Sequence, residues 1–254
     1  MLTRYRVWLN GQGLHDIDPT IIITDVQESK PEESVTTVGV GVRDGLRILN
    51  RRRDSLSVGI RFELREYDTA RRKAIYDKIV SWACDGVLTI SDRPEQQLRV
   101  ACDEVPTVSS ALRWTSALTI TFTAYTQPYW EEVHPVTAVY TGSNGTVTIR
   151  PMGNMPCMLE ADVYNTSGGT INTLTISANG SAFSFASLGL AAGATLAIAY
   201  EDGILSAKIG AKSVLSARTE ASSDDIELSA QTNTVAIQAG GNVKVTIKAR
   251  GRWR

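Results

Sequence analysis

The chain has 254 residues, 43% of them hydrophobic and 21% charged, and its 26 basic and 27 acidic residues leave a formal net charge of -1. This composition suffices for a packed core and argues against a disordered chain. The near balance of charge argues against a general nucleic-acid or anionic-membrane binder, which needs a surplus of lysine and arginine.

The first half of the chain alternates between apolar and polar residues, the pattern of strands with one buried face. We predict strands in RYRVWL (residues 4–9), TIIITDV (20–26) and SVTTVGVGV (34–42), with a hairpin turn at Asn10-Gly11. LTITFTA (118–124) is a further strand of this kind. The clearest strand is SLSVGIRFELR (55–65), whose inward face would hold Leu56, Val58, Ile60, Phe62 and Leu64.

One segment of this half has helical periodicity instead. Ile75, Ile79 and Trp82 fall at i, i+4 and i+7, which places them on a single apolar stripe. A lone amphipathic helix must cover part of a sheet, because its apolar stripe needs a partner surface. We therefore interpret Ile75, Ile79 and Trp82 as the residues that anchor the single helix of this domain.

The ends of the helix also have sequence signals. Asp68 or Thr69 suits the N-cap position, because a short polar side chain can accept a hydrogen bond from the first turn. Gly86 suits the left-handed residue that ends a helix. A strand, VLTISDRP (87–94), is expected directly after it.

The run Arg51, Arg52 and Arg53 is the one basic cluster. It precedes the strand at 55–65, so we expect it in a turn. One interpretation is a solvated turn, and the other is a contact with a partner's acidic surface or with passing DNA. Three arginines alone would form a weak nucleic-acid site. We keep Arg51, Arg52 and Arg53 as a candidate partner contact.

The composition changes near residue 133. Pro128 and Pro135 flank this point, and proline cannot donate to a sheet ladder, so we place a boundary between domains 1–133 and 134–254. Short alternating segments separated by glycine turns predict that the second domain is an all-β sandwich or jelly roll. The last strand, 243–254, has two possible placements, in that sandwich or back on the first domain. The predicted fold class is mainly β, with one helix in the first domain.

Few residues are candidates for a catalytic, metal-binding or phosphate-binding site. His15 lies in a predicted loop and His134 in the linker, and neither has a nucleophile motif beside it. Asp16 and Asp18 could contribute to a cation site, but two carboxylates in a turn are more often turn formers. The glycines of VGVGVRDG (38–45) lack phosphate-loop spacing. We predict no catalytic, cofactor or metal site, and no enzyme.

The cysteine content and the hydropathy of the chain indicate the cellular environment in which we expect it. Cys84, Cys102 and Cys157 are widely spaced and form no CxxC pair, so we expect reduced, buried thiols. No apolar run is long enough for a membrane helix, and the start lacks the apolar stretch of a signal peptide. We expect no membrane partner and synthesis in a cytoplasm.

The order of elements in the first half resembles that of the distal tail protein (Dit) of long non-contractile-tailed phages. The resemblance rests on RVWLNG (6–11), the helix that ends near Trp82, the strand followed by the DRP turn (92–94), and the closing segment YTQPYW (125–130). The second half is similar to the family's galectin-like C-terminal domain in size and all-β character.

This resemblance implies a structural role. Family members form a hexameric ring through their N-terminal domains at the tip of the tail. The ring joins the tail-tube protein to the baseplate hub, or tail-associated protein, and its lumen passes tape measure and DNA. The C-terminal domains project outward and hold receptor-binding proteins in some relatives. The implied location is the virion tail tip, after assembly in the cytoplasm of a bacterial host.

Two alternatives remain. Tail-tube proteins use a similar sandwich-plus-helix module, so a tube protein is one. The other is a carbohydrate-binding module, because galectin-like sandwiches bind sugars. Sugar sites usually offer an exposed aromatic ring. The second half argues against this alternative, because it has one tryptophan, Trp253, near its end and three tyrosines that we expect within strands: Tyr140, Tyr164 and Tyr200.

Overall fold

The structure is a computed structural model that describes residues 5–29, 32–39, 46–107, 118–201 and 203–253. The chain forms two compact units, Met1–Trp130 and Glu131–Arg254, and each is described by itself. Strands dominate both units, so the prediction of a mainly β fold is confirmed. No helix in the described ranges is long and apolar enough to span a membrane.

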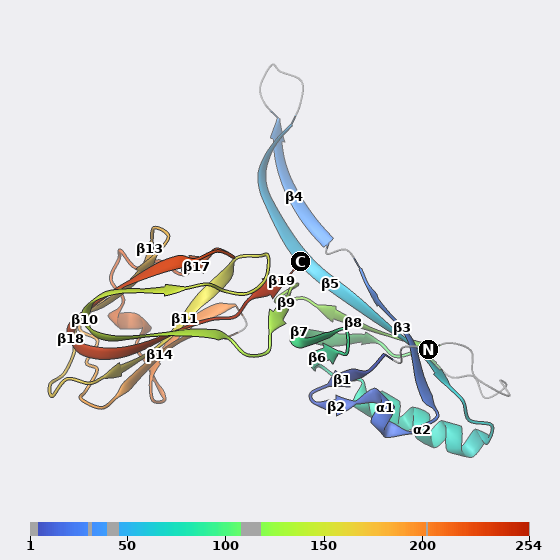
Figure 1. The fold of residues 1–254 in the computed structure, drawn as a ribbon. Coiled ribbons are helices and arrows are strands. Elements are labelled where there is room, and N and C mark those ends of the chain that lie inside the picture. Colours follow the sequence, from blue (N-terminus) through green and yellow to red (C-terminus); the bar gives the residue numbers. More distant parts are fainter. Residues whose placement is uncertain (1–4, 30–31, 40–45, 108–117, 202, 254) are drawn as a thin grey trace. The chain divides into compact units, whose positions relative to one another are not determined.

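The first unit is an antiparallel sheet with a long helix, α2, and a short one, α1 (Figure 1). Its strands follow the order β2-β1-β6-β7-β8-β5-β3, and β4 pairs with β5. The bounds are β1 Val7–Leu9, β2 Gln12–Gly13, α1 Leu14–Ile17, β3 Ile21–Glu28, β4 Glu32–Gly39, β5 Leu46–Leu64, α2 Thr69–Trp82, β6 Gly86–Ile90, β7 Arg93–Glu104 and β8 Leu118–Ala124. A short strand, β9 (Trp130–Glu132), spans the boundary of the two units.

The core of this unit is the inward face of β5 and its neighbours. The second part of β5 lies between β3 and β8, and the five predicted inward residues are all buried: Leu56, Val58, Ile60, Phe62 and Leu64. Strand β8 contributes Leu118, Ile120, Phe122 and Ala124. The period-two alternation predicted the buried face of β5 correctly, because this strand has one face toward the core.

Helix α2 begins where the sequence predicts, but it ends earlier. The Asp68 carboxylate caps it, accepting from Ala70 N at 2.8 Å and from Arg71 N at 3.4 Å. The expected end at Gly86 is wrong, because the helix stops at Trp82 and Gly86 starts β6. A second helix, α1, was also not expected, since four residues are too few to show periodicity.

A glycine is needed at position 86 because the Asn10 side chain lies close to its Cα, and not because the backbone makes a left-handed turn there. The Asn10 side chain accepts a hydrogen bond from Val87 N at 2.9 Å and donates to the Asp85 carbonyl at 3.3 Å. A Cβ at Gly86 would collide with that side chain. Asn10 itself, with φ of 51°, and Gly11, with φ of 78°, form the predicted turn between β1 and β2.

The second unit consists of strands and one 3-10 turn in its described residues. Its order is β13-β12-β18-β11-β14-β15-β16, with β10 paired to β18 and β17 paired to β11. The bounds are β10 Val136–Ile149, β11 Cys157–Asn165, β12 Leu174–Ala178, β13 Ser181–Phe185, β14 Thr195–Glu201, β15 Ile204–Ile209, β16 Lys212–Ser213, the 3-10 turn Leu215–Ala217, β17 Glu227–Leu228, β18 Asn233–Ala249 and β19 Arg252–Trp253.

Strand β18 is shared by two sections of this sheet. Its first part pairs with β12, and its second part, Val243–Ala249, pairs with β11. Side chains from both sections form one buried core, which includes Phe183 from β13 and Ile198 from β14. Of the predicted last strand, 243–254, the part Val243–Ala249 pairs with β11 and β10 in the second unit's own sheet, whereas Arg252–Trp253 forms β19, which pairs with β9.

Candidate assembly interface

Strand β4 and the first part of β5 form a two-stranded ribbon, called here the arm. The two strands pair from Glu32↔Ser55 to Gly39↔Leu46. Only beyond this region, from Leu56 onward, does β5 pair with β8. Figure 1 shows the arm extending past the edge of the sheet to which the rest of β5 belongs. Among the described residues, the arm therefore has no further strand beside it.

The surface of the arm is exposed and partly apolar. Every residue from Ser34 to Gly39 and from Leu46 to Asn50 is exposed. The large apolar side chains among them have exposed fractions of 44% (Val35), 45% (Val38), 69% (Leu46), 52% (Ile48) and 60% (Leu49). Exposed apolar side chains grouped in this way are typical of an interaction site.

The strand register divides these side chains between two faces. Cross-strand partners in an antiparallel pair share a face, so Thr37↔Ile48 and Gly39↔Leu46 place Ile48 and Leu46 together. Val35 lies two residues before Thr37 and therefore shares this face. One face of the arm is thus mainly aliphatic toward its outer end.

The opposite face is mixed. Val38 pairs with Arg47, and Thr36 pairs with Asn50. The register shifts between Thr36 and Thr37, which makes Leu49 an extra residue on β5. A partner on this face would meet a positive charge and polar groups beside Val38.

Polar contacts join the two strands at the base of the arm, and one of them also reaches Tyr129 outside the arm. Arg53 lies 3.7 Å from the Glu33 carboxylate and stacks over the Tyr129 ring, with 5.2 Å to the centroid. The Arg53 side chain is only 11% exposed, so this interaction is largely shielded from water. The Ser34 hydroxyl also contacts the Asp54 carboxylate across the two strands.

The basic run does not form the predicted turn. Arg51, Arg52 and Arg53 lie within β5, where Arg51 and Arg52 pair with Val35 and Ser34. Strand β5 continues through these arginines because β4 pairs with it there. The local sequence does not reveal this pairing. The side chains of Arg51 and Arg52 lie outside the described part of the structure, so their role as a partner contact stays a proposal. Arg53 is engaged with its own chain.

The predicted helix anchors all face the core side of α2. Ile75, Ile79 and Trp82 are 3%, 0% and 5% exposed. The Trp82 indole meets Phe122 of β8 edge-on at 6.0 Å and donates a hydrogen bond to the Gln12 carbonyl at 2.8 Å. Trp82 thereby joins α2 to two separate strands.

The candidate acid–base residues have structural partners. His15 lies in α1, not in the expected loop, and packs edge-on against Trp8 at 5.4 Å. Hydrogen bonds from the Thr20 hydroxyl and backbone N–H to Asp18 lower the pKa of that carboxyl. No group of three metal donors occurs within the described ranges.

The three cysteines are free, but they are not all buried as expected. Cys84 is exposed just after α2, Cys102 is half-buried and Cys157 is buried. Burial raises the pKa of the Cys157 thiol to about 11. Burial, assisted by the charges of Asp103 and Asp85, also raises the pKa of Cys102.

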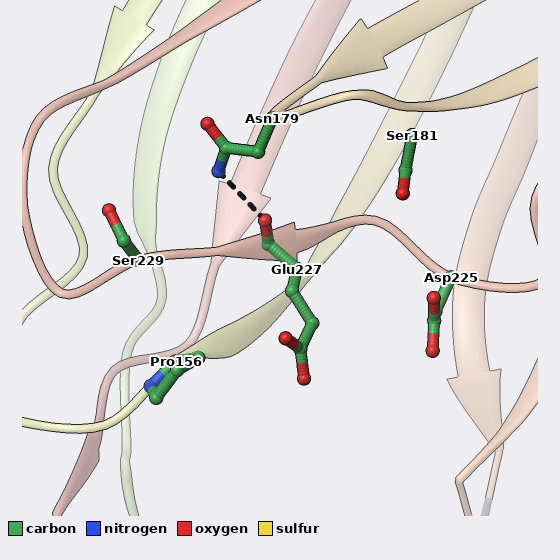
Figure 2. Close-up of a pocket in the computed structure, with 6 residues that line it drawn as sticks. All are labelled: Pro156, Asn179, Ser181, Asp225, Glu227 and Ser229. Carbon is green, nitrogen blue, oxygen red and sulfur yellow. Dashed lines mark hydrogen bonds between the residues drawn. The ribbon is translucent and has the colours of Figure 1, made fainter.

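A polar depression of about 490 Å³ opens on the second unit (Figure 2). Its lining is Pro156, Asn179, Ser181, Asp225, Glu227 and Ser229, with no aromatic side chain among them. The Asn179 amide donates to the Glu227 carbonyl at 2.9 Å, so it braces the strand rather than pointing to a ligand. This lining does not provide the stacking ring that the sugar-binding alternative requires.

The fold is similar to that of solved phage proteins. The SPP1 Dit protein (gp 19.1), described as a paradigm of the hub adsorption apparatus in phages that infect Gram-positive bacteria, superposes with a TM-score of 0.70 at 12% identity, covering 97% of this chain and 98% of that chain. The Dit resemblance predicted from sequence is thus confirmed at the level of the fold.

Two chains from the phage p2 baseplate are more distant. The activated conformation with Sr gives a TM-score of 0.49 at 10% identity, covering 97% of both chains. The activated conformation with Ca gives 0.48 at 11% identity, covering 99% of this chain and 98% of that chain. No protein-family model and no curated protein sequence matches the chain.

Proposed function

We propose that this chain is a structural protein of a phage tail tip, where copies of it form a ring that joins the tail tube to the baseplate hub. The ring would be hexameric, as the Dit resemblance implies, with a channel for tape measure and DNA. The likeness of fold to SPP1 Dit over nearly the whole chain supports this role. A structural role, not catalysis, is what such a likeness favours.

The observation that carries the proposal is the exposed arm. Burying an aliphatic side chain fully contributes about 1.5–3 kcal/mol. The five apolar arm residues are about half exposed, so covering them would contribute several kcal/mol in total, by the same order-of-magnitude rule (roughly 25 cal/mol per Å²). A neighbouring copy in a ring is the partner we propose for this surface.

The remaining partners follow from the same role. The tail-tube protein and the hub would lie on the two sides of the ring, and a receptor-binding protein is a further candidate for the second unit. DNA would contact the protein only in passage. We also propose that Arg51 and Arg52 face acidic residues of a neighbouring protein, since like charges repeated around a ring need neutralisation.

The test is the mass of the purified full chain by light scattering. The double variant Leu46→Lys/Ile48→Lys places two charges on the aliphatic face and should shift the protein to monomer. Ile204→Lys is the matched control, because Ile204 is 73% exposed and lies in the second unit. The proposal fails if the wild type stays monomeric alone and with hub and tube proteins, or if both variants assemble equally.

A further inference from the structure

Strand β10 has a partner on one edge only. It pairs with β18 from Val136↔Ala249 to Ile149↔Asn233, across its whole length. Within the described ranges, no other strand pairs with its second edge and no loop forms a backbone hydrogen bond to it. Backbone N–H and C=O groups on that edge are therefore left to water or to another chain.

The other terminal strands of the same sheet are protected. The outer edge of β13 is covered by the segment around Arg218–Ser223, through bonds such as Thr219 N to Ser184 O at 2.9 Å and Ser223 N to Ala182 O at 2.7 Å. At the other end, β16 has only two residues and begins with Lys212. Short length, charge and coverage are the usual protections of sheet edges.

Strand β10 lacks these protections. Its 14 residues include no charged residue and no proline. Its one irregularity is the register shift between Gly142 and Asn144, where Gly142 has φ of 145°. This bulge separates a first section, Val136–Thr141, from a second section, Gly145–Ile149. Each section is long enough to accept a short added strand.

The first section has a surface suited to pairing with itself. Thr137, Val139 and Thr141 are exposed on its outer face, and Val139 is 53% exposed. Ala138 and Tyr140 on the other face pack against the core. The exposed residues are neutral and β-branched, so an approaching copy would meet no like charge and would have good strand formers.

We propose that residues 137–141 of β10 pair antiparallel with the same residues of a second copy of this chain, centred on Val139. In this register Val139 faces Val139, Thr137 faces Thr141, and Ala138 faces Tyr140. Each cross-strand pair is then apolar with apolar or hydroxyl with hydroxyl on the outer face, and small with large on the inner face. The pairing extends each sheet into the next copy by main-chain hydrogen bonds.

This surface lies on the second unit and is separate from the arm, so the inference does not depend on the proposed ring. Five residues make a short interface, and we expect free protomers to associate weakly. Copies held together by the arm would present several such edges at once, which strengthens pairing between two assemblies through effective concentration.

The test places a cysteine at the centre of the pairing. Directly opposite Cβ atoms in a strand pair lie about 4.5–5.5 Å apart, close enough for a disulfide after a small adjustment. In a Cys84→Ser background, which removes the exposed native thiol, Val139→Cys should give a cross-linked dimer under diamide. Thr148→Cys, an exposed threonine beyond the bulge, should not, since its two copies would lie tens of ångströms apart.

Two further measurements complete the test. Val139→Lys should lower concentration-dependent association several-fold, while Thr148→Lys should leave it unchanged. Val139→Cys should still cross-link when Leu46→Lys/Ile48→Lys has disrupted the arm, which separates this inference from the ring. The proposal is overturned if Val139→Cys and Thr148→Cys cross-link to the same extent, or if neither cross-links at any concentration. Pairing of β10 with another protein only would give this second result.

Discussion

The Arg93 guanidinium lies over the indole of Trp130, 5.2 Å from the ring centroid. Glu28 connects the two side chains, because one of its oxygens accepts from Trp130 Nε1 at 3.0 Å and from Arg93 Nη2 at 3.1 Å. Arg93 is the first residue of β7 and comes from the DRP segment, and Trp130 ends the aromatic segment YTQPYW. Two of the segments on which the sequence resemblance rests therefore contact each other, and both are hydrogen-bonded to Glu28 at the end of β3.

Replacing Glu28 tests this closure. Glu28→Ala leaves the Trp130 indole N–H without its acceptor in a site that is 1% exposed. We expect a loss of about 1–3 kcal/mol in the free energy of unfolding of the first unit. Urea unfolding followed by tryptophan fluorescence measures it, since four of the five tryptophans lie in Met1–Trp130. Glu95→Ala, on the exposed part of β7, is the control and should change little.

Trp82 is proposed to anchor α2 on the sheet. Trp82→Ala removes a large buried ring and should cost about 3–5 kcal/mol. Trp82→Phe keeps most of the packing but loses the bond to the Gln12 carbonyl, so about 1 kcal/mol is expected. Val80→Ala on the exposed face of the same helix should be nearly neutral. Equal melting temperatures for Trp82→Ala and Val80→Ala would contradict the anchor.

The thiols should differ in reactivity and in pH response. Cys84 should react with iodoacetamide at pH 8, while Cys157 should not react until the protein unfolds. Burial raises the folded-state pKa of Cys157 to about 11, above its ordinary value of 9.0, so folding favours the neutral thiol. Stability should therefore be complete below about pH 9 and fall as pH rises toward 11. Cys157→Ala should show a shallower fall, and identical slopes would refute the assignment.

The two units are proposed to be separable domains, and the cut site matters. Arg252 Nε donates to Glu131 at 2.9 Å, and Arg250 Nη1 donates to the Glu132 and Val133 carbonyls at 2.7 and 2.8 Å. A fragment of residues 131–254 keeps these acceptors, whereas 134–254 lacks them. We expect both to be β-rich by circular dichroism, with a lower urea midpoint for 134–254. Insolubility of both fragments would argue against separable domains.

Sequence alone predicted the parts of the fold whose residues have a periodic pattern. Local spacing predicted the buried face of β5 and the stripe of Ile75, Ile79 and Trp82, and it narrowed the N-cap to Asp68 or Thr69, of which the structure has Asp68. The predicted end of α2 at Gly86 is wrong. The glycine at this position instead makes room for the side chain of Asn10, a residue far away in the sequence. Local patterns contain no information about such a contact.

The arm was missed for a related reason. Alternation in SVTTVGVGV predicts a strand, but it does not tell whether the apolar face meets a core or solvent. The arginines at 51–53 then suggested a turn, although pairing with β4 keeps them in the strand. The apolar LRIL stretch (46–49) next to a basic run was the available signal for an exposed ribbon.

The most direct test of the proposed role is negative-stain imaging of the purified full chain, alone and with the tail-tube and hub proteins of the same phage. We predict rings with a central hole and a particle mass that is a fixed multiple of the 27.6 kDa chain. The Leu46→Lys/Ile48→Lys variant should show no rings. Isolated monomers in every wild-type preparation, with and without those partners, would contradict the role proposed for this protein.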